Sequence, residues 1–176
     1  LEMMREAYFC TVFCGIETPE TEALQAISKQ QNLSMPILEA VKVLNSYGLE
    51  VVSGIIMGLD TDTPDTADRI LEFIRLSQIP TLTINLLHAL PRTPLWRRLE
   101  QEGRLVFDEN RESNVEFLMP YEQVVEMWRR CITTAYEPEF LYQRFAYNME
   151  HTYPNRIEVP NSPARTSKEN IRKGLT

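Results

Sequence analysis

Three apolar runs of β-forming residues, each ending at a polar group, limit the folds open to this chain more than any other feature. Residues that typically begin a helix follow each run. This order is typical of successive βα units in a parallel sheet, whose functional groups gather at the carboxyl ends of the strands. We therefore predict an α/β fold with about three parallel βα units. The runs are Tyr8–Phe13, Leu49–Met57 and Thr81–Leu87, and they lead into Cys14-Gly15-Ile16-Glu17, Gly58-Leu59-Asp60 and His88.

Residues that start and stop helices separate the three runs. Ser34 is an expected N-cap, and Gly48 has the place of a glycine that ends a helix in the left-handed conformation. Thr63-Pro64 and Thr93-Pro94 each combine a cap residue with a proline at the first helical position. We also predict a short helix over Glu22–Gln30.

The pattern divides the chain into three parts. Residues 1–103 carry the βα rhythm, and because they open on a helix-like stretch we interpret them as the second half of a larger unit. Residues 104–153 change to two helical patterns, in which apolar residues recur every three or four positions. Residues 154–176 combine prolines with polar and charged residues and are expected to form an irregular tail.

Charge and cysteine content exclude several classes of function. The formal net charge of −7 and the pI near 5.0 argue against non-specific nucleic-acid binding, which needs a basic surface. No apolar run approaches the roughly 18 residues of a membrane span. The three cysteines, an odd number, do not suit a disulfide framework and favour a reducing compartment, so we expect a cytoplasmic protein.

Two of the cysteines have the spacing of iron–sulfur ligands without the third ligand. Cys10 and Cys14 are four residues apart, and the next ligand would fall at position 17, which is Glu17. In a strand, the two thiols would point to the same side about 13 Å apart, too far to share a small cluster. We interpret both as small buried apolar residues, and Cys131, on an apolar helix face, as a packing residue. No metal ligand and no catalytic residue is predicted in this chain.

Gly54 and Gly58 surround the end of the second run, where glycine marks a bulge or a close approach to the backbone. A flat ring such as adenine can lie against a backbone of this kind. The alternative is a tight turn into the segment that contains Asp60, Asp62 and Asp65, which we interpret as turn and cap residues because the spacing of a calcium loop is absent.

Glu17 and His88 are the side chains expected at the other two strand ends. Glu17 is placed to accept hydrogen bonds from ligand hydroxyls, or alternatively to complement the dipole of a following helix. His88 directly follows an apolar strand and is either a ligand-lining residue or a hydrogen-bonded structural group.

Taken together, three segments resemble the second half of a radical S-adenosylmethionine enzyme, from the fourth to the sixth strand of its six-stranded partial (β/α) barrel. More narrowly, the chain resembles the cobalamin-binding-domain group that includes hopanoid methylases, in which a small helical domain follows the barrel. The segments are Gly15-Ile16-Glu17-Thr18-Pro19, Gly54-Ile55-Ile56-Met57-Gly58-Leu59-Asp60-Thr61 and Leu90-Pro91-Arg92-Thr93-Pro94-Leu95.

The resemblance implies roles for four residues. Glu17 would contact the ribose or amino-acid part of S-adenosylmethionine, the backbone from Gly54 to Gly58 would lie beside adenine, and His88 would line the adenine or substrate side. The CxxxCxxC motif that holds the 4Fe-4S cluster, and the cobalamin ligands, would precede Leu1. The resemblance thus implies a methylase-like parent that acts on a small-molecule or lipid substrate, and predicts that this chain alone is inactive.

Two other readings stay open at this point. The chain could be half of an ordinary (β/α) barrel enzyme, which predicts phosphate-binding glycines or carboxylate clusters at the strand ends. It could instead be a non-catalytic α/β interaction module, which predicts a complete sheet with both edges protected. A half barrel would also expose a strand edge and an apolar face, through which two copies could form a homodimer.

Overall fold

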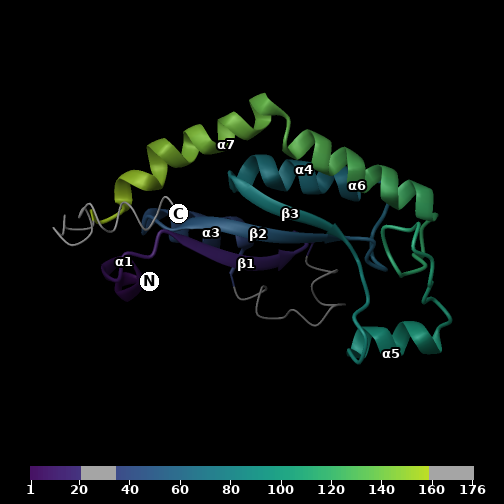
Figure 1. The fold of residues 1–176 in the computed structure, drawn as a ribbon. Helices are drawn as coiled ribbons and strands as arrows, with labels where there is room; N and C mark the ends of the chain where they lie inside the picture. Colours follow the sequence, from purple (N-terminus) through teal and green to yellow (C-terminus); the bar gives the residue numbers. More distant parts are fainter. Residues whose placement is uncertain (21–34, 159–176) are drawn as a thin grey trace, which may run out of the picture.

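The computed structural model describes residues 1–20 and 35–158, and Figure 1 shows how their elements are arranged. The expected helix at Glu22–Gln30 and the expected cap at Ser34 lie outside these residues. The elements in chain order are α1 (Glu2–Glu6), β1 (Thr11–Glu17), α3 (Ile37–Ser46), β2 (Glu50–Met57), α4 (Thr66–Ser77), β3 (Thr81–Leu86), α5 (Pro94–Gln101), α6 (Tyr121–Ala135), α7 (Pro138–His151) and the short 3-10 helix η2 (Tyr153–Asn155).

Within the described residues the strands form one parallel sheet in the order β1-β2-β3. Each strand is followed along the chain by a helix or a helix-containing segment, so the predicted α/β fold with parallel βα units followed by helices is confirmed. The three strands lie side by side in their order along the chain, as successive strands of a (β/α) barrel do.

The two faces of the sheet differ in burial. On β3, Leu82, Ile84 and Leu86 are buried against helices, and their register partners on β2 include the buried Ile55 and Met57. On the opposite face Phe13, Thr83 and Asn85 of the two outer strands are exposed, whereas Gly54 of the central strand is buried between them. We call this second face the open face; in a barrel, the face turned away from the helices is the interior. Figure 1 shows α4 and α6 together along β3.

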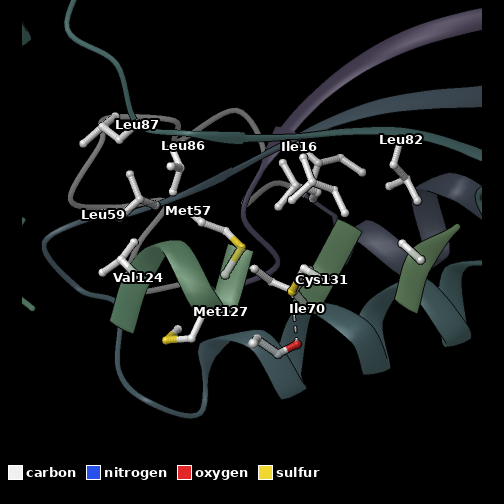
Figure 2. Close-up of a cluster of buried hydrophobic side chains, with 14 of the residues drawn as sticks. Ile16, Met57, Leu59, Ile70, Leu82, Leu86, Leu87, Val124, Met127 and Cys131 are labelled. Atoms are coloured by element: carbon white, nitrogen blue, oxygen red, sulfur yellow. Dashed lines mark hydrogen bonds between the residues drawn. The ribbon is translucent and has the colours of Figure 1, made fainter. Parts of the chain in front are cut away.

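One buried apolar cluster joins the sheet to the helices that follow it. Figure 2 shows Met57 and Leu86 at the strand ends above α6, from which Val124 points toward them. Ile70 of α4 lies beside Cys131 of α6, whose Sγ donates to the backbone oxygen of Ala67 at 3.7 Å. Burial raises the pKa of the Cys131 thiol to about 11, and the packing role predicted for this cysteine is confirmed.

Several local predictions are confirmed by the backbone. Gly48 follows α3 with a φ of 77°, the left-handed conformation expected of a residue that ends a helix. Thr93 caps α5 by accepting a hydrogen bond from the Trp96 N–H at 3.2 Å, with Pro94 as the first helical residue. The two helical patterns after residue 104 are α6 and α7.

The first strand starts later along the chain than predicted. The strand runs from Thr11 through Glu17, not from Tyr8, because Tyr8 has a φ of 60° and the chain before it is still turning out of α1. Cys10 therefore precedes the strand and is exposed, with its Sγ donating to the Tyr8 carbonyl, so its predicted burial is wrong. Cys14 is half-buried against the core, and burial raises the pKa of its thiol.

The start of α4 also differs from the prediction. The helix begins at Thr66 rather than at Thr63-Pro64, because residues 63–65 form a turn before it. The Thr63 N–H donates to the Thr66 hydroxyl at 2.9 Å, which closes this turn ahead of the helix.

The outer edge of β3 is covered by side chains of the helical region. The hydroxyl of Tyr136 accepts a hydrogen bond from the Leu82 N–H at 3.2 Å and donates to the Leu82 carbonyl. The indole N–H of Trp128 donates to the Ile84 carbonyl at 2.8 Å. Backbone groups that would otherwise be free to pair with another chain are thereby satisfied.

A buried arginine joins the last two helices to the start of β3. Arg144 of α7 is 1% exposed, and its guanidinium donates to the carbonyls of Ile79, Ala135 and Phe140. Ala135 is the last residue of α6, so its carbonyl has no partner within the helix and lies at the negative end of the helix dipole. Burial lowers the pKa of Arg144.

We expect Arg144→Met to lower the free energy of unfolding by about 3–5 kcal/mol, because two buried carbonyls and one part-buried carbonyl lose a charged donor. Arg130→Met is the matched control, since Arg130 forms an exposed ion pair with Asp68, and should change it by less than about 1 kcal/mol. Urea unfolding followed by circular dichroism measures both. Equal losses in the two variants would contradict the assigned role of Arg144.

Candidate functional site

The carboxyl ends of the three strands lie at one edge of the sheet because the strands are parallel. The register aligns Gly15, Gly54 and Thr83 in a row across the sheet, one position on each strand. Glu17 and His88 stand at the carboxyl ends of β1 and β3. The structure thus brings the ends of all three predicted segments to one edge of the sheet.

Glu17 lies in a strained backbone conformation. It is the last residue of β1, its φ is 66°, and the register to β2 shifts between Gly15 and Glu17. The Thr18 N–H donates to the Ile16 carbonyl at 2.8 Å, which closes a three-residue γ-turn centred on Glu17. A non-glycine residue with this φ is uncommon, and such strain concentrates at sites of function.

Gly54 lies within β2 rather than at its end, and it pairs with Gly15 on β1 and with Thr83 on β3. A bulge on β1 follows immediately after the Gly15–Gly54 pair. A Cβ at position 54 would lie 3.4 Å from the Thr83 Oγ1 and 3.5 Å from the Phe13 Cζ, which are ordinary contact distances. The close approach of another group to Gly54 stays a prediction.

Gly58 has a different explanation. Its φ is 92°, and a Cβ there would lie 2.5 Å from the ring of Phe117. Phe117 is 6% exposed and stacks on Tyr121 with ring centroids 5.8 Å apart. Glycine is required at this position by the turn and by the packing of Phe117, a contact that the sequence pattern does not reveal.

The acidic residues after β2 have two distinct roles. Asp62 accepts hydrogen bonds from the N–H groups of Gly58 at 2.6 Å and Leu59 at 3.2 Å, so its predicted role in the turn is confirmed. Asp60 instead forms ion pairs with Arg98 at 2.9 Å and Arg104 at 2.6 Å. No local sequence pattern reveals these pairs, because both arginines come from the region that follows β3.

Environment shifts the pKa values of the two carboxyl groups in opposite directions. Burial raises the pKa of Asp62 to about 6, against the smaller opposing effect of its two backbone hydrogen bonds. Burial also raises the pKa of Asp60, but the hydrogen bonds and charges of Arg104 and Arg98 outweigh it and hold the pKa below its usual value.

His88 is exposed between two buried residues whose backbones are held on both sides. The Leu87 N–H donates to the Met57 carbonyl at 2.7 Å, and the Leu87 carbonyl accepts from the Ser113 hydroxyl at 2.5 Å. The side-chain amide of Asn114 both accepts from the Ala89 N–H and donates to the Ala89 carbonyl, each at 2.8 Å. No sequence motif marks Ser113 or Asn114 as a functional residue.

Residues 104–106 and 113–117, which we call the clasp, form a short antiparallel pairing around the bridge between Leu105 and Val115. The Val106 N–H donates to the Asn114 carbonyl at 2.9 Å, and the Glu116 N–H donates to the Arg104 carbonyl at 2.8 Å. Through Arg104 and Phe117 the clasp contacts the end of β2, and through Ser113 and Asn114 it contacts the segment after β3.

No group of three or more histidine, cysteine, aspartate or glutamate side chains that could hold a metal ion occurs in residues 1–20 and 35–158. Cys10 is exposed, Cys14 is half-buried and Cys131 is buried in α6. No helix in the described part of the chain combines the length and apolar character needed to cross a membrane.

Comparison with known proteins gives a consistent relationship. Residues 93–176 match a family described as a domain of unknown function (DUF4070). The chain is 59% identical over 175 residues, 99% of its length, to a hopanoid C-2 methylase of Rhodopseudomonas palustris (strain TIE-1). It is 35% identical over 144 residues, 78% of its length, to an uncharacterized methyltransferase of Synechocystis sp..

The chain spans 33% and 27% of the lengths of these two relatives. The resemblance to the group that includes hopanoid methylases, predicted from three short segments, is confirmed by this similarity. The clasp, α5, α6 and α7 all lie within the part of the chain that the domain of unknown function matches.

The two glycines of β2 and its turn should respond differently to alanine. Gly58→Ala should lower the free energy of unfolding by about 2–4 kcal/mol, because it combines a positive φ with a collision against Phe117. Gly54→Ala should change it by less than about 1 kcal/mol, since the added Cβ meets only ordinary contacts. Urea unfolding of both variants checks this, and equal losses would contradict it.

Asp62 should make part of the stability depend on pH. The pKa of Asp62 is about 6 in the folded chain and has its ordinary value of 3.8 in the unfolded chain. The protonated carboxyl therefore contributes folding stability that is fully present below pH 3.8 and is lost as pH rises through 6. Between pH 4 and 7 the wild type should lose on the order of 2 kcal/mol relative to Asp62→Asn. Asp65→Asn controls for removal of a charge from the same loop. Parallel pH profiles for wild type and Asp62→Asn would contradict the assignment.

Proposed function

We propose that this chain is the carboxyl-terminal part of the barrel, with its helical extension, of a radical S-adenosylmethionine enzyme that methylates a hopanoid. The observation that carries the proposal is the 59% identity to a hopanoid C-2 methylase over nearly the whole chain. The arrangement of the strands supports it, because consecutive parallel strands with one open face are an arc of a barrel. The substrate class is then an apolar lipid, and the proposed reaction is methyl transfer.

The open face is the side of the sheet that we assign to S-adenosylmethionine. Gly54 lacks a side chain on that face, which suits close approach of adenine to the backbone. Glu17 is assigned to the ribose or amino-acid part, which its carboxylate can bind as a hydrogen-bond acceptor. His88, exposed at the third strand end, is assigned to the adenine or substrate side. These residues bind and orient the cofactor and exclude water from it.

S-adenosylmethionine, together with a 4Fe-4S cluster and cobalamin, would supply the radical and methyl-transfer chemistry. The cysteines of this chain do not fit a cluster, because the three thiols differ in burial and do not converge within the described residues. We therefore assign the ligands of the cluster and of cobalamin to parts of the whole protein outside this chain. The free thiols also favour a reducing compartment, and on that ground we propose a cytoplasmic location.

The interaction-module alternative predicts that both edges of the sheet are protected. The edge of β3 is covered by Tyr136 and Trp128, but no strand in the described residues pairs with the outer edge of β1. In the enzyme we assign that edge to the preceding strand of the same barrel. A second copy of this chain could take the same edge only when that strand is missing.

The test compares this chain with the whole protein after reconstitution of its cluster and cobalamin. With S-adenosylmethionine and a strong reductant, the whole protein should form 5′-deoxyadenosine and methylate a hopanoid. This chain alone should form no 5′-deoxyadenosine above the reductant-only control, because it lacks the cluster ligands. Cleavage by this chain alone, or no methylated hopanoid from the whole protein, would overturn the proposal.

Gly54→Ala in the whole protein tests the assignment of the open face. Its fold should be kept, and its affinity for S-adenosylmethionine should fall by roughly tenfold, equivalent to about 1.4 kcal/mol. Equilibrium dialysis measures the affinity. Ser46→Ala, an exposed substitution on α3, is the control and should leave it unchanged. An unchanged affinity in Gly54→Ala would contradict the assignment of adenine to this face.

A further inference from the structure

We propose that Asn114 is a positioning residue, which fixes the backbone of the segment after β3 so that His88 is held at the strand ends. The inference rests on the proposed function only in taking His88 as part of the cofactor and substrate site. It also gives a role to part of the region that matches a domain of unknown function. Ser113 assists in the same role.

The backbone on either side of His88 is fully hydrogen-bonded. Leu87 and Ala89 have four polar backbone groups between them, and all four are hydrogen-bonded: to Met57, to Ser113 and twice to Asn114. Ala89 is 0% exposed and Leu87 is 7% exposed. A residue whose two neighbours are fixed in this way has little freedom to move its own backbone, whereas its exposed side chain stays available.

The side chain of Asn114 matches the backbone of Ala89 chemically. A primary amide presents one acceptor and one donor on a single planar group, as a backbone residue does. Both bonds are 2.8 Å long. A carboxylate of the same shape accepts but cannot donate, so it would lose the bond to the Ala89 carbonyl and place negative charge beside it. Asparagine is therefore suited to this contact and aspartate is not.

Asn114 is itself anchored to the end of the neighbouring strand, β2, through the clasp. The backbone carbonyl of Asn114 accepts a hydrogen bond from the N–H of Val106, which belongs to the clasp. Arg104, in the same pairing, forms an ion pair with Asp60 at 2.6 Å, directly after β2. Phe117 packs against Gly58 at the end of β2. The clasp therefore fixes the segment that carries His88 relative to β2, which contributes Gly54 to the open face.

The first measurement is hydrogen exchange of the whole protein, which does not depend on activity. In Asn114→Leu, which removes both side-chain bonds to Ala89, the amide of Ala89 should exchange at least tenfold faster than in the wild type, because its N–H loses its hydrogen-bond acceptor. Asn148→Leu is the matched control. Asn148 is a buried amide that donates to the Gln78 carbonyl at the opposite end of β3, and its substitution should not affect the Ala89 amide selectively. Unchanged exchange at Ala89 in Asn114→Leu would overturn the proposal.

The second measurement is a double-mutant cycle on methylation by the reconstituted whole protein. Asn114→Asp should lower kcat about tenfold or more in the wild type but less than about twofold in His88→Gln, because it acts through His88. Asn148→Asp should lower kcat by the same factor in both backgrounds. An Asn114→Asp effect of equal size in both backgrounds would overturn the positioning role. If the wild type methylates nothing, the proposed function fails, and the exchange measurement still decides the position of the segment.

Discussion

The outward-facing backbone of β3 is the constraint on which much of this structure depends. β3 is the last strand of the sheet, so its outer N–H and C=O groups have no neighbouring strand. A closed barrel removes such edges, and an open arc has to cover them by other means. Here the covering groups come from the helical region: Tyr136 at Leu82 and Trp128 at Ile84. The helical region therefore completes the sheet with side chains where a strand would otherwise be needed.

The same region satisfies its own helix ends with buried polar groups. Arg144 donates to the terminal carbonyl of α6 and to the Ile79 carbonyl just before β3. Asn148, one turn later on α7, donates to the Gln78 carbonyl at 2.8 Å. Apolar side chains could fill this space but could not satisfy the carbonyls, and an unsatisfied buried carbonyl costs about 1–3 kcal/mol. Polar anchors at the start of β3 and the clasp beyond its end hold the helical region at both ends of one strand.

The sequence predicts the repeating parts of this fold and misses the contacts between distant segments. The second and third strands, α6 and α7 follow from local periodicity, which depends on neighbouring residues alone. The start of β1 was missed because Tyr8 adopts a φ of 60°, which no apolar pattern encodes. The bonds from Asn114 to Ala89 span 25 residues, and those from Tyr136 to Leu82 span 54. Polar pairs at such separations depend on the completed topology, so a single sequence cannot identify them.

The two glycines of β2 and its turn show how a structure separates two readings that a sequence leaves equal. At Gly58 the missing side chain is replaced by the Phe117 ring, so packing accounts fully for the glycine. At Gly54 the structure leaves room for a Cβ at ordinary contact distance, so no collision accounts for the glycine, and the adjacent strand bulges directly after its pair with Gly15. Glycine weakens a strand and marks either a bulge or a close approach to the backbone, and we propose the second role for Gly54. The strained turn at Glu17 comes directly after the bulge on the adjacent strand. Because backbone strain concentrates at functional sites, this turn supports the proposal that the cofactor binds beside Gly54.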